Sequence, residues 1–465
     1  MKYQIGSENR PLSVAIIGSG PSAFYAAGDL LNRTELNVQV DMFDRLPTPY
    51  GLVRGGVAPD HQRIKNVTKI YERIASLPQF RFWGNVNFGT DISREEILKH
   101  FDCIVYAVGA KSDRQMGIPG EQLIGSYSAT EFVGWYNGHP DYLDAQFDFS
   151  VEKVAIIGMG NVAIDVARIL AKTPEELAST DIADYALEAL KNSRVKNIYV
   201  IGRRGPVQAA FTSPEAKEML ELEQTEVIVD PEVLKLDGAS QRFLDTTKNR
   251  DTVRTMEILQ RIAGTEPEGK PRQLHLMFQY SPLEIYGSNE RVSGIKLVKN
   301  KLVEGEGGRI KAEETGIIEE LPVGLVLRSI GYKGVALPGV SFDEREGIIP
   351  NHNGRVVDER TKEICSREYV VGWAKRGPTG VIGTNKPDAI ETTQHLLEDF
   401  RGQTAEAPEE LKRESIEAWL KSKKIEYVTF EGWKRLDQHE IDEGAKKGKP
   451  RQKTTKIEDM LKIIK

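Results

Sequence analysis

Two stretches of the chain repeat one pattern of apolar and polar positions. Residues 14–31 read VAIIGSGPSAFYAAGDLL, and residues 154–170 read VAIIGMGNVAIDVARIL. Each stretch begins with an apolar run rich in β-branched residues, passes through G-x-G-x-x-A, and continues with apolar residues at helical spacing. Each therefore predicts a buried strand, a tight turn and a helix.

Other parts of the chain extend this alternation. Further apolar runs predict buried strands at residues 38–43, 103–108, 198–201, 325–330 and 369–371. An amphipathic pattern predicts a helix over about residues 251–262. Strands that alternate with helices are typical of parallel sheets covered on both faces, so we predict an α/β fold class.

The composition changes this picture little. The 465 residues are 28% charged and 39% hydrophobic with a net charge of −6, as in ordinary globular proteins of two or three domains. No apolar run approaches the roughly 18 residues of a membrane span, so we expect no integral membrane segment; we also expect no nucleic-acid partner. Residues 1–11 carry neither the apolar core of a signal peptide nor an Arg-rich amphipathic pattern. We expect a bacterial cytoplasmic location, with the mitochondrial matrix as the alternative if a presequence has been removed.

The cysteine content excludes several kinds of redox centre. Cys103 and Cys365 are the two cysteines of the chain. They are too few for a disulfide framework, a four-thiolate zinc site or an iron–sulfur cluster, so we expect no metal site. Any redox chemistry must therefore use a bound cofactor.

The first glycine turn has the features of a dinucleotide site. Gly18 allows the tight turn, Gly20 lets the backbone approach a pyrophosphate, and the small Ala23 lets the helix pack on the strand. The helix N-terminus then attracts phosphate. The next strand ends at Asp44, where a carboxylate can accept hydrogen bonds from a ribose 2′-hydroxyl.

The second turn places Gly158, Gly160 and Ala163 in the same roles, but its following strand ends in Arg203 and Arg204. Two guanidinium groups can bind a 2′-phosphate that an acid would repel, so this turn should prefer NADP(H). The alternative is that both arginines are ordinary surface residues.

The two turns together predict FAD at the first and a nicotinamide nucleotide at the second. The fold would then hold two Rossmann-like dinucleotide-binding domains. We place a discontinuous FAD domain at residues 1–108 and 332–465, with a C-terminal extension from about residue 401, and an inserted NADP domain at residues 109–331.

Longer motifs point to a family. The chain reads PYGLVRGGVAPDHQRIKNV from residue 49, GWAKRGPTGVIGTNKPDAIET from residue 372, and contains GNVAIDVARIL, FVGWYNGHP and GRRGPVQAAFT. Over nearly its whole length it closely resembles adrenodoxin reductase and its bacterial ferredoxin–NADP reductase relatives. The resemblance implies one noncovalent FAD, NADPH as electron donor, and a small acidic iron–sulfur protein of the ferredoxin or adrenodoxin type that takes electrons one at a time, or the reverse flow.

The resemblance also implies the cofactor contacts. For FAD these are Gly18, Gly20, Ser22, Ala23, Asp44, Leu52, Phe88 by its backbone, Trp373, Gly380, Val381 and Ile382. For NADP they are Met159, Gly160, Asn161, Val162, Arg203, Arg204, Glu215 and Gly380. Ala23 and Asp44 stand where the family usually has Gly and Glu, and both replacements keep the chemistry. A packed core indole is the alternative for Trp373.

Two residues are candidates for proton handling at the flavin. The resemblance places His61 near the flavin and the nicotinamide pocket, and Glu215 near the nicotinamide. A histidine at the start of a helix can equally be structural. Hydride transfer needs no protein acid, so His61 and Glu215 would relay or orient the proton at the reduced flavin.

The acceptor should dock on a locally basic surface near the flavin, because charge steering speeds association. The candidates in the NADP domain are Lys248, Arg250, Arg254 and Arg261. An ordinary solvated helix face is the alternative. The basic run KKGKPRQKTTK, residues 446–456, is expected to be a solvated tail, with docking as its second possible role.

Other functions remain open at this point. A flavin-dependent disulfide reductase is disfavoured because the chain has no C-x-x-C pair. Another acceptor, such as a quinone, or a non-catalytic protein that keeps FAD for structure, would share the same nucleotide motifs.

Overall fold

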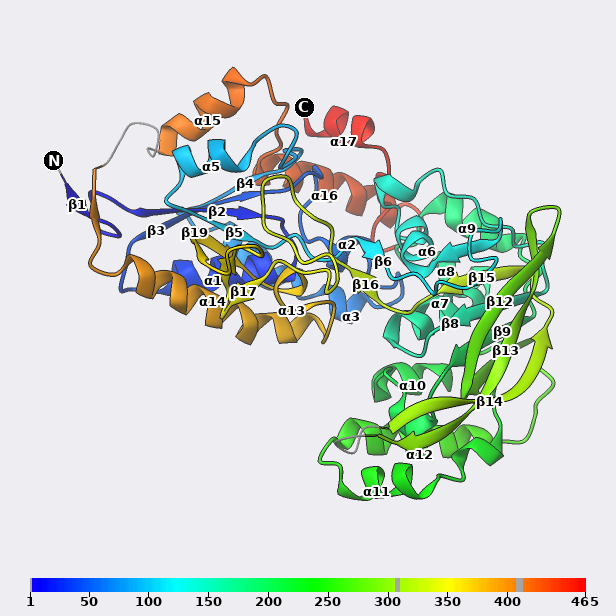
Figure 1. The fold of residues 1–465 in the computed structure, drawn as a ribbon. Helices are drawn as coiled ribbons and strands as arrows, with labels where there is room; N and C mark the ends of the chain where they lie inside the picture. The colour runs from blue at the N-terminus through cyan, green and yellow to red at the C-terminus, as the bar shows by residue number, and fades with distance from the viewer. Residues whose placement is uncertain (1, 306–309, 407–412) are drawn as a thin grey trace.

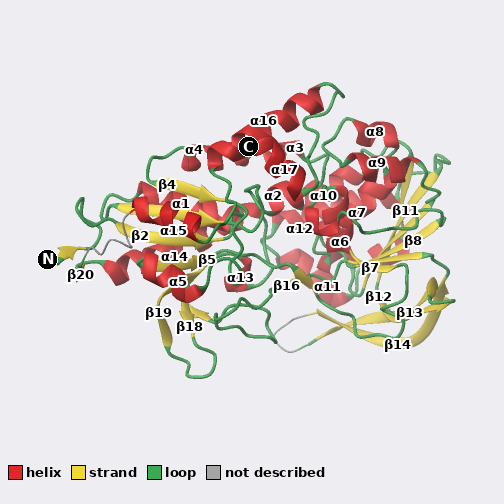
Figure 2. Ribbon diagram, turned by 90° about the horizontal axis from the view of Figure 1, so that it is seen from above, coloured by secondary structure: helices red, strands yellow, loops and turns green. Residues whose placement is uncertain are grey.

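Two large sheets, each with a parallel core, organise the protein. The structure is a computed structural model, and it describes residues 2–305, 310–406 and 413–465. Figure 1 shows the two sheets in separate halves of the molecule, joined near the middle, and Figure 2 shows them side by side from above. The α/β fold class predicted from the sequence is confirmed.

The first sheet has seven strands in the order β17-β18-β19-β5-β2-β3-β4. The strands β19, β5, β2, β3 and β4 run parallel, and β17, β18 and β19 pair antiparallel. Their bounds are β2 Leu12–Ile17, β3 Val38–Phe43, β4 Phe80–Trp83, β5 Cys103–Tyr106, β17 Asn351–His352, β18 Arg355–Val357 and β19 Ile364–Val370. The sheet thus draws its strands from both ends of the chain.

Helices cover both faces of this sheet, because alternate residues of each strand point to opposite sides. Val14 and Ile16 of β2 pack in one core cluster, while Ala15 and Ile17 pack in another. The first cluster takes residues from α1 Pro21–Asn32, α4 Thr68–Ala75, α14 Asn385–Phe400, α16 Phe430–Ala445 and α17 Ile457–Ile464. The second takes residues from α5 Arg94–His100 and α15 Arg413–Ser422.

The second sheet has six parallel strands in the order β10-β11-β9-β8-β15-β7. Their bounds are β7 Ser126–Ser128, β8 Lys153–Ile157, β9 Asn197–Gly202, β10 Thr225–Val229, β11 Arg272–Phe278 and β15 Leu325–Arg328. One face packs on helices α6 Ala129–Tyr136, α7 Asn161–Ala171, α9 Asp184–Lys191, α10 Ser213–Met219 and α12 Arg250–Ala263.

The other face of the second sheet packs on an antiparallel sheet that the sequence pattern did not predict. Its strands are β12 Tyr280–Ser288, β13 Arg291–Glu304 and β14 Ile310–Leu321. Ile285, Ile295 and Leu297 of this sheet pack against Ala155 and Ile157 of β8. Figure 1 shows it as long ribbons along the outer side of that half.

Shorter elements complete the chain. The paired strands are β1 Tyr3–Gln4 with β20 Thr404–Ala405, and β6 Ser112–Asp113 with β16 Tyr332–Lys333. The remaining helices are α2 Leu52–Gly55, α3 Gln62–Lys65, α8 Pro174–Ala178, α11 Gly238–Thr246 and α13 Trp373–Arg376. Single 3-10 turns are η1 Pro140–Tyr142, η2 Pro206–Gln208, η3 Pro231–Leu234 and η5 Ile382–Thr384. Within the described ranges, no helix has the length and apolarity to span a bilayer.

The predicted helix over residues 251–262 is confirmed as α12, and the predicted strands are confirmed with ends shifted by a few residues. The domain limits at residues 108/109 and 331/332 stay a prediction. The sheets support these limits. β6 and β16 each lie just after one of the limits and pair with each other, so together they form the double connection between the two halves.

The prediction for the basic run at residues 446–456 was wrong. Lys449 is 8% exposed and Lys453 is 4% exposed, so two of its cations are buried. Asp184 lies 2.5 Å from Lys449, and Asp181 lies 3.6 Å from Lys453. Both acids come from the other half of the molecule, and no pattern local to residues 446–456 could reveal them.

Candidate functional site

The first glycine turn, between β2 and α1, is shaped to hold a ligand. Gly18 has φ = 102°, and a Cβ there would lie 2.5 Å from the Ala107 carbonyl oxygen, so only glycine fits. At Gly20, by contrast, a Cβ would meet no described atom within 4 Å apart from its chain neighbours. No side chain caps the N-terminus of α1. The free amides therefore face open space, as a bound pyrophosphate requires.

Asp44 follows β3 directly and fastens this turn. Its Oδ2 accepts hydrogen bonds from the Ser19 amide at 3.0 Å and the Ser19 hydroxyl at 2.5 Å. Its Oδ1 accepts from the Leu46 amide at 2.9 Å. A carboxylate can accept about four hydrogen bonds, so about one position is left for a ribose hydroxyl. The sequence did not predict that Asp44 also holds the turn in place through these hydrogen bonds.

The segment that follows β19 meets the same turn. A Cβ on Gly372, whose φ is 72°, would lie 2.5 Å from the Ser22 hydroxyl, so the start of α13 contacts the start of α1. The Trp373 indole donates to the Thr379 carbonyl at 3.2 Å, and its ring contacts that of Tyr332 in a tilted arrangement, with 5.3 Å between ring centres. The indole is half-buried, not enclosed in a core.

The other residues expected to contact FAD differ in exposure. Leu52 on α2 is 37% exposed and Val381 is 55% exposed, so both apolar side chains are free to contact a cofactor. Gly380 is also exposed, and Ile382 is half-buried. Phe88 is buried, with its ring 5.9 Å from that of Tyr106, so only its backbone is free for a ligand. Ala23 is buried where α1 packs on the sheet.

The second glycine turn, between β8 and α7, repeats the first. A Cβ on Gly158 would lie 2.0 Å from the Ser329 carbonyl oxygen, whereas one on Gly160 would meet no described atom within 4 Å beyond its chain neighbours. The Met159 carbonyl accepts from the Ala210 amide at 2.8 Å, and the Asn161 side chain accepts from the Thr212 amide at 2.9 Å. The turn is therefore held against residues 210–212. Val162 is half-buried beside it.

Arg203 and Arg204 follow β9 and remain available to an anion. Both side chains are exposed, and neither forms an ion pair within the described residues. Burial and the neighbouring charge of Arg203 lower the pKa of Arg204. Two adjacent cations without an acid repel each other, so a phosphate between them would relieve that repulsion.

His61 and Glu215 do not contact each other. His61 lies just before α3, and its Nε2 is 2.7 Å from a carboxylate oxygen of Glu218, one turn along α10 from Glu215. Glu215 instead accepts a hydrogen bond from the Thr212 hydroxyl, beside the second turn. Burial alone would lower the pKa of His61, but the hydrogen bond to Glu218 and the charge of Asp165 outweigh it, and the net pKa is raised.

An ionic cluster surrounds His61 where the two halves of the molecule meet. The fully buried Arg168 of α7 lies 2.9 Å from Asp60, 3.0 Å from Asp165 and 2.7 Å from Glu218. His61 Nδ1 lies 3.7 Å from Asp165. Burial raises the pKa of Asp165 to about 6, against the opposing charges of Arg168 and His61. The cluster can therefore hold or release a proton near neutral pH.

Sequence reasoning missed Glu218, Asp165 and Arg168. A signal was present for two of them, because Asp165 and Arg168 interrupt the otherwise apolar helix GNVAIDVARIL at a spacing of one turn. Glu218 shares one helix with Glu215, three positions on. Its contact with His61 joins residues 157 positions apart, which no local pattern shows.

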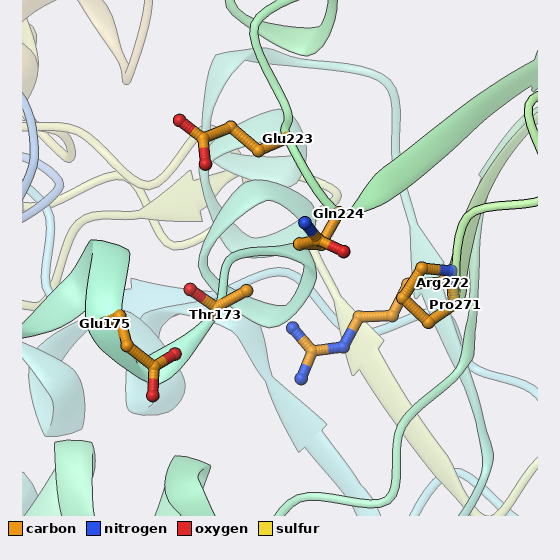
Figure 3. A pocket seen from close by; sticks show the side chains of 6 residues that line it. All are labelled: Thr173, Glu175, Glu223, Gln224, Pro271 and Arg272. Carbon is orange, nitrogen blue, oxygen red and sulfur yellow. The ribbon is translucent and has the colours of Figure 1, made fainter.

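A separate pocket of about 430 Å³ lies away from these turns (Figure 3). Its lining includes Glu223 and Gln224, just before β10, and Pro271 and Arg272, where β11 begins. It therefore sits at the amino ends of these parallel strands. Nucleotides bind outside the carboxyl ends, where both glycine turns lie, so this pocket is not part of the site.

Two open glycine turns, each between an interior strand of a sheet with a parallel core and the helix that follows it, define an oxidoreductase class that binds two dinucleotides. The family model described as pyridine nucleotide-disulphide oxidoreductase matches residues 12–278. The chain belongs to this family and, by the relatives described next, to its adrenodoxin reductase-type ferredoxin–NADP reductases.

The relatives match almost end to end. The chain is 43% identical to "NADPH-ferredoxin reductase FprA" of Mycobacterium tuberculosis over 98% of this chain and 99% of that protein. It is 41% identical to mitochondrial "NADPH:adrenodoxin oxidoreductase" of Arabidopsis thaliana over 99% of this chain and 97% of that protein. The solved structure of Mycobacterium tuberculosis FprA in complex with NADPH has a TM-score of 0.92 at 42% identity, covering 98% of this chain and all of that one.

Proposed function

We propose that this protein is an NADPH-dependent flavoprotein reductase that passes electrons through FAD to a ferredoxin- or adrenodoxin-like iron–sulfur protein. The observation that carries the proposal is the pairing of two open glycine turns with unlike ribose sites, Asp44 at the first and the unpaired Arg203 and Arg204 at the second. Full-length similarity to reductases named for NADPH and ferredoxin or adrenodoxin supports it.

The residues present fit both cofactors. Gly20 and Gly160 each leave room where a Cβ would stand, and the exposed Leu52 and Val381 offer an apolar wall for a ring system. When bound, FAD would accept a hydride from NADPH and give up two electrons singly. The protein's part is to hold the two rings face to face and to exclude water.

The overall reaction balances with two acceptors for each nucleotide. NADPH loses two electrons and one proton as a hydride, each iron–sulfur protein gains one electron, and the proton passes to solvent. His61 and Glu218 could carry that proton, because they share a hydrogen bond of 2.7 Å and this hydrogen bond, with the charge of Asp165, raises the pKa of His61 against the effect of burial. Glu215, held by Thr212 beside the second turn, would orient the nicotinamide.

The acceptor would dock on α12 and the segment before it. Lys248, Arg250, Arg254 and Arg261 are exposed, and within the described residues none forms an ion pair. α12 packs on α10, the helix that carries Glu218, and the Ser213 hydroxyl at the start of α10 donates to Asp251 at 2.6 Å, so this basic surface begins beside the start of α10. An acidic partner would be steered to it at low salt. A bacterial cytoplasmic location stays a prediction.

The test is a coupled assay with purified holoprotein, NADPH, an iron–sulfur protein and cytochrome c. We expect cytochrome c reduction to require the iron–sulfur protein and to yield two reduced cytochromes per NADPH. Equal reduction without it would point to another acceptor such as a quinone. Among the described residues Cys103 is buried and Cys365 half-buried, both free, which disfavours an internal disulfide acceptor.

A further inference from the structure

The loop between α16 and α17, residues 446–456, lies between the two halves of the molecule. In Figure 1 the red chain that leaves α16 passes beside α6 before it enters α17. We call residues 446–456 the strap. Lys453, which is 4% exposed, and Lys449, which is 8% exposed, are its most buried cations.

Lys453 joins three segments through one ammonium group. Its Nζ donates to the Asn137 side chain at 3.0 Å, at the end of α6, and to the Arg54 carbonyl at 3.2 Å, in α2. It also lies 3.6 Å from the Asp181 carboxylate. Asn137 and Asp181 belong to the half with the six-stranded sheet, and Arg54 to the half with the seven-stranded one.

Other buried contacts hold the same junction. Asp181 pairs with Lys65 of α3 at 2.7 Å, so this acid receives a cation from the strap and another from the first half of the molecule. Lys449 lies 2.5 Å from Asp184 and donates to the Ile182 carbonyl at 3.3 Å. Burial lowers the pKa of Lys453, despite the opposing charge of Asp181.

Glu440 of α16 fixes the strap on its own side. This fully buried carboxylate pairs with Arg54 at 2.6 Å and with Arg451 of the strap at 3.2 Å. It also accepts from the Thr454 amide at 2.8 Å, and its backbone carbonyl accepts from the Gln452 amide at 2.7 Å. The strap thus keeps one conformation, with Lys453 directed at the junction.

We propose that Lys453 is a positioning residue that fixes the angle between the two nucleotide-binding halves, and so the approach of the nicotinamide to the flavin. Domains of one chain move relative to each other by default. An apolar junction can slide, but a shift here would leave buried charges unpaired, so the ionic contacts select one arrangement. Hydride transfer needs that arrangement, because small displacements of the reacting groups slow it strongly. The inference rests on the proposed function.

The test replaces Lys453 by Met, which keeps the length of the side chain and removes its charge, in the full-length holoprotein. The matched control is Lys447→Met, because Lys447 also pairs with Asp184 at 2.5 Å but is about half exposed. Rapid mixing with NADPH gives the limiting rate of flavin reduction and the Kd for NADPH. Hydrogen exchange reports the junction independently of activity.

We expect K453M to lower the limiting rate about tenfold or more while the Kd changes less than twofold, and to speed exchange at the amides of Gln452, Thr454 and Ala183. K447M should leave the limiting rate and the hydrogen exchange unchanged. An unchanged limiting rate and unchanged exchange in K453M would overturn the inference, and so would equal losses of rate, NADPH affinity and FAD content.

A second variant keeps the inference testable if K453M does not fold. Asp181→Asn weakens the same contact from the other half, and we expect the same split between rate and Kd. If wild-type flavin is not reduced by NADPH at all, the proposed function fails, while the exchange measurement still decides whether Lys453 holds the junction.

Discussion

The imidazole Nε2 of His61 lies 2.7 Å from a carboxylate oxygen of Glu218, and this hydrogen bond crosses the junction between the two halves of the molecule. His61 precedes α3, beside the seven-stranded sheet, and Glu218 lies on α10, beside the six-stranded sheet. Proton transfer through this pair would therefore be possible only while the two halves are in contact.

Glu218→Gln should lower the pKa of His61, because a neutral amide stabilises the imidazolium less than a carboxylate does. If His61 accepts the proton that leaves the reduced flavin on reoxidation, the low-pH limb of the profile for reoxidation by the iron–sulfur protein should move to lower pH. A ring-proton NMR titration of His61, compared with a His61→Gln sample to assign the signal, measures the pKa itself. An unmoved pKa would mean that Glu218 does not set it.

The same pair predicts a pH window for stability. The pKa of His61 is raised above its ordinary 6.5. The contribution of His61 to the free energy of unfolding is therefore complete below pH 6.5 and is lost as pH rises through the raised pKa. The pKa of Glu218 is lowered from 4.5, because His61 and Arg168 outweigh the effect of its burial. The contribution of Glu218 to the free energy of unfolding is therefore complete above pH 4.5 and is lost as pH falls through the lowered pKa. The Tm difference between wild type and E218Q should be largest near pH 5–6, at roughly 2 °C, and should shrink by pH 9.

Replacing Arg203 and Arg204 together with Ala should remove most of the preference for NADPH over NADH. Each lost charge-assisted hydrogen bond to a phosphate is worth about 1.5 kcal/mol or more, so the ratio of kcat/KM values should fall about 100-fold. FAD content should not change. Arg242→Ala is the matched control, since that exposed arginine pairs with Glu304. A ratio equal to wild type would refute the 2′-phosphate assignment.

Gly20→Ala separates binding from folding at the first turn. Its Cβ would meet no described neighbour within 4 Å, and its φ is −78°. The stability of the apoprotein should therefore change by less than about 0.5 kcal/mol. The added methyl group should, however, obstruct the pyrophosphate and lower FAD affinity at least tenfold. Gly18→Ala should instead destabilise the apoprotein, because its Cβ would lie 2.5 Å from the Ala107 carbonyl oxygen at φ = 102°. Thermal unfolding and FAD titration of both variants decide the matter; equal FAD binding by G20A and wild type would remove Gly20 from the site.

The sequence predicted most of what lies along single segments. The turns at Gly18 and Gly158, and the helix that became α12, depend on local spacing, which sequence shows directly. The pairing of His61 with Glu218 and the burial of Lys453 depend on which distant segments meet, and each charged residue alone looked like a surface position. The antiparallel strands β12–β14 were missed because much of β14 faces solvent and lacks an apolar pattern.

Arg250→Glu with Arg254→Glu should slow reduction of the iron–sulfur protein at low salt, by about tenfold or more, because two reversed charges oppose an acidic partner. NADPH-dependent ferricyanide reduction should stay within twofold of wild type. Lys191→Glu with Lys196→Glu is the control, a double reversal on another surface of the same half, where both lysines already pair with acids. If ferricyanide and iron–sulfur reduction fell equally, the defect would lie in folding or NADPH binding and not in docking.

The central claim is that electrons pass from NADPH to bound FAD and then to a separate iron–sulfur protein. Anaerobic stopped-flow mixing of the holoprotein with NADPH, followed by a second mix with oxidised ferredoxin, tests it most directly. The account predicts bleaching of the flavin's visible absorbance by NADPH, much faster than by NADH, and its return with two equivalents of ferredoxin. Flavin that stays oxidised with NADPH, or reduced flavin that ferredoxin does not reoxidise, would contradict it.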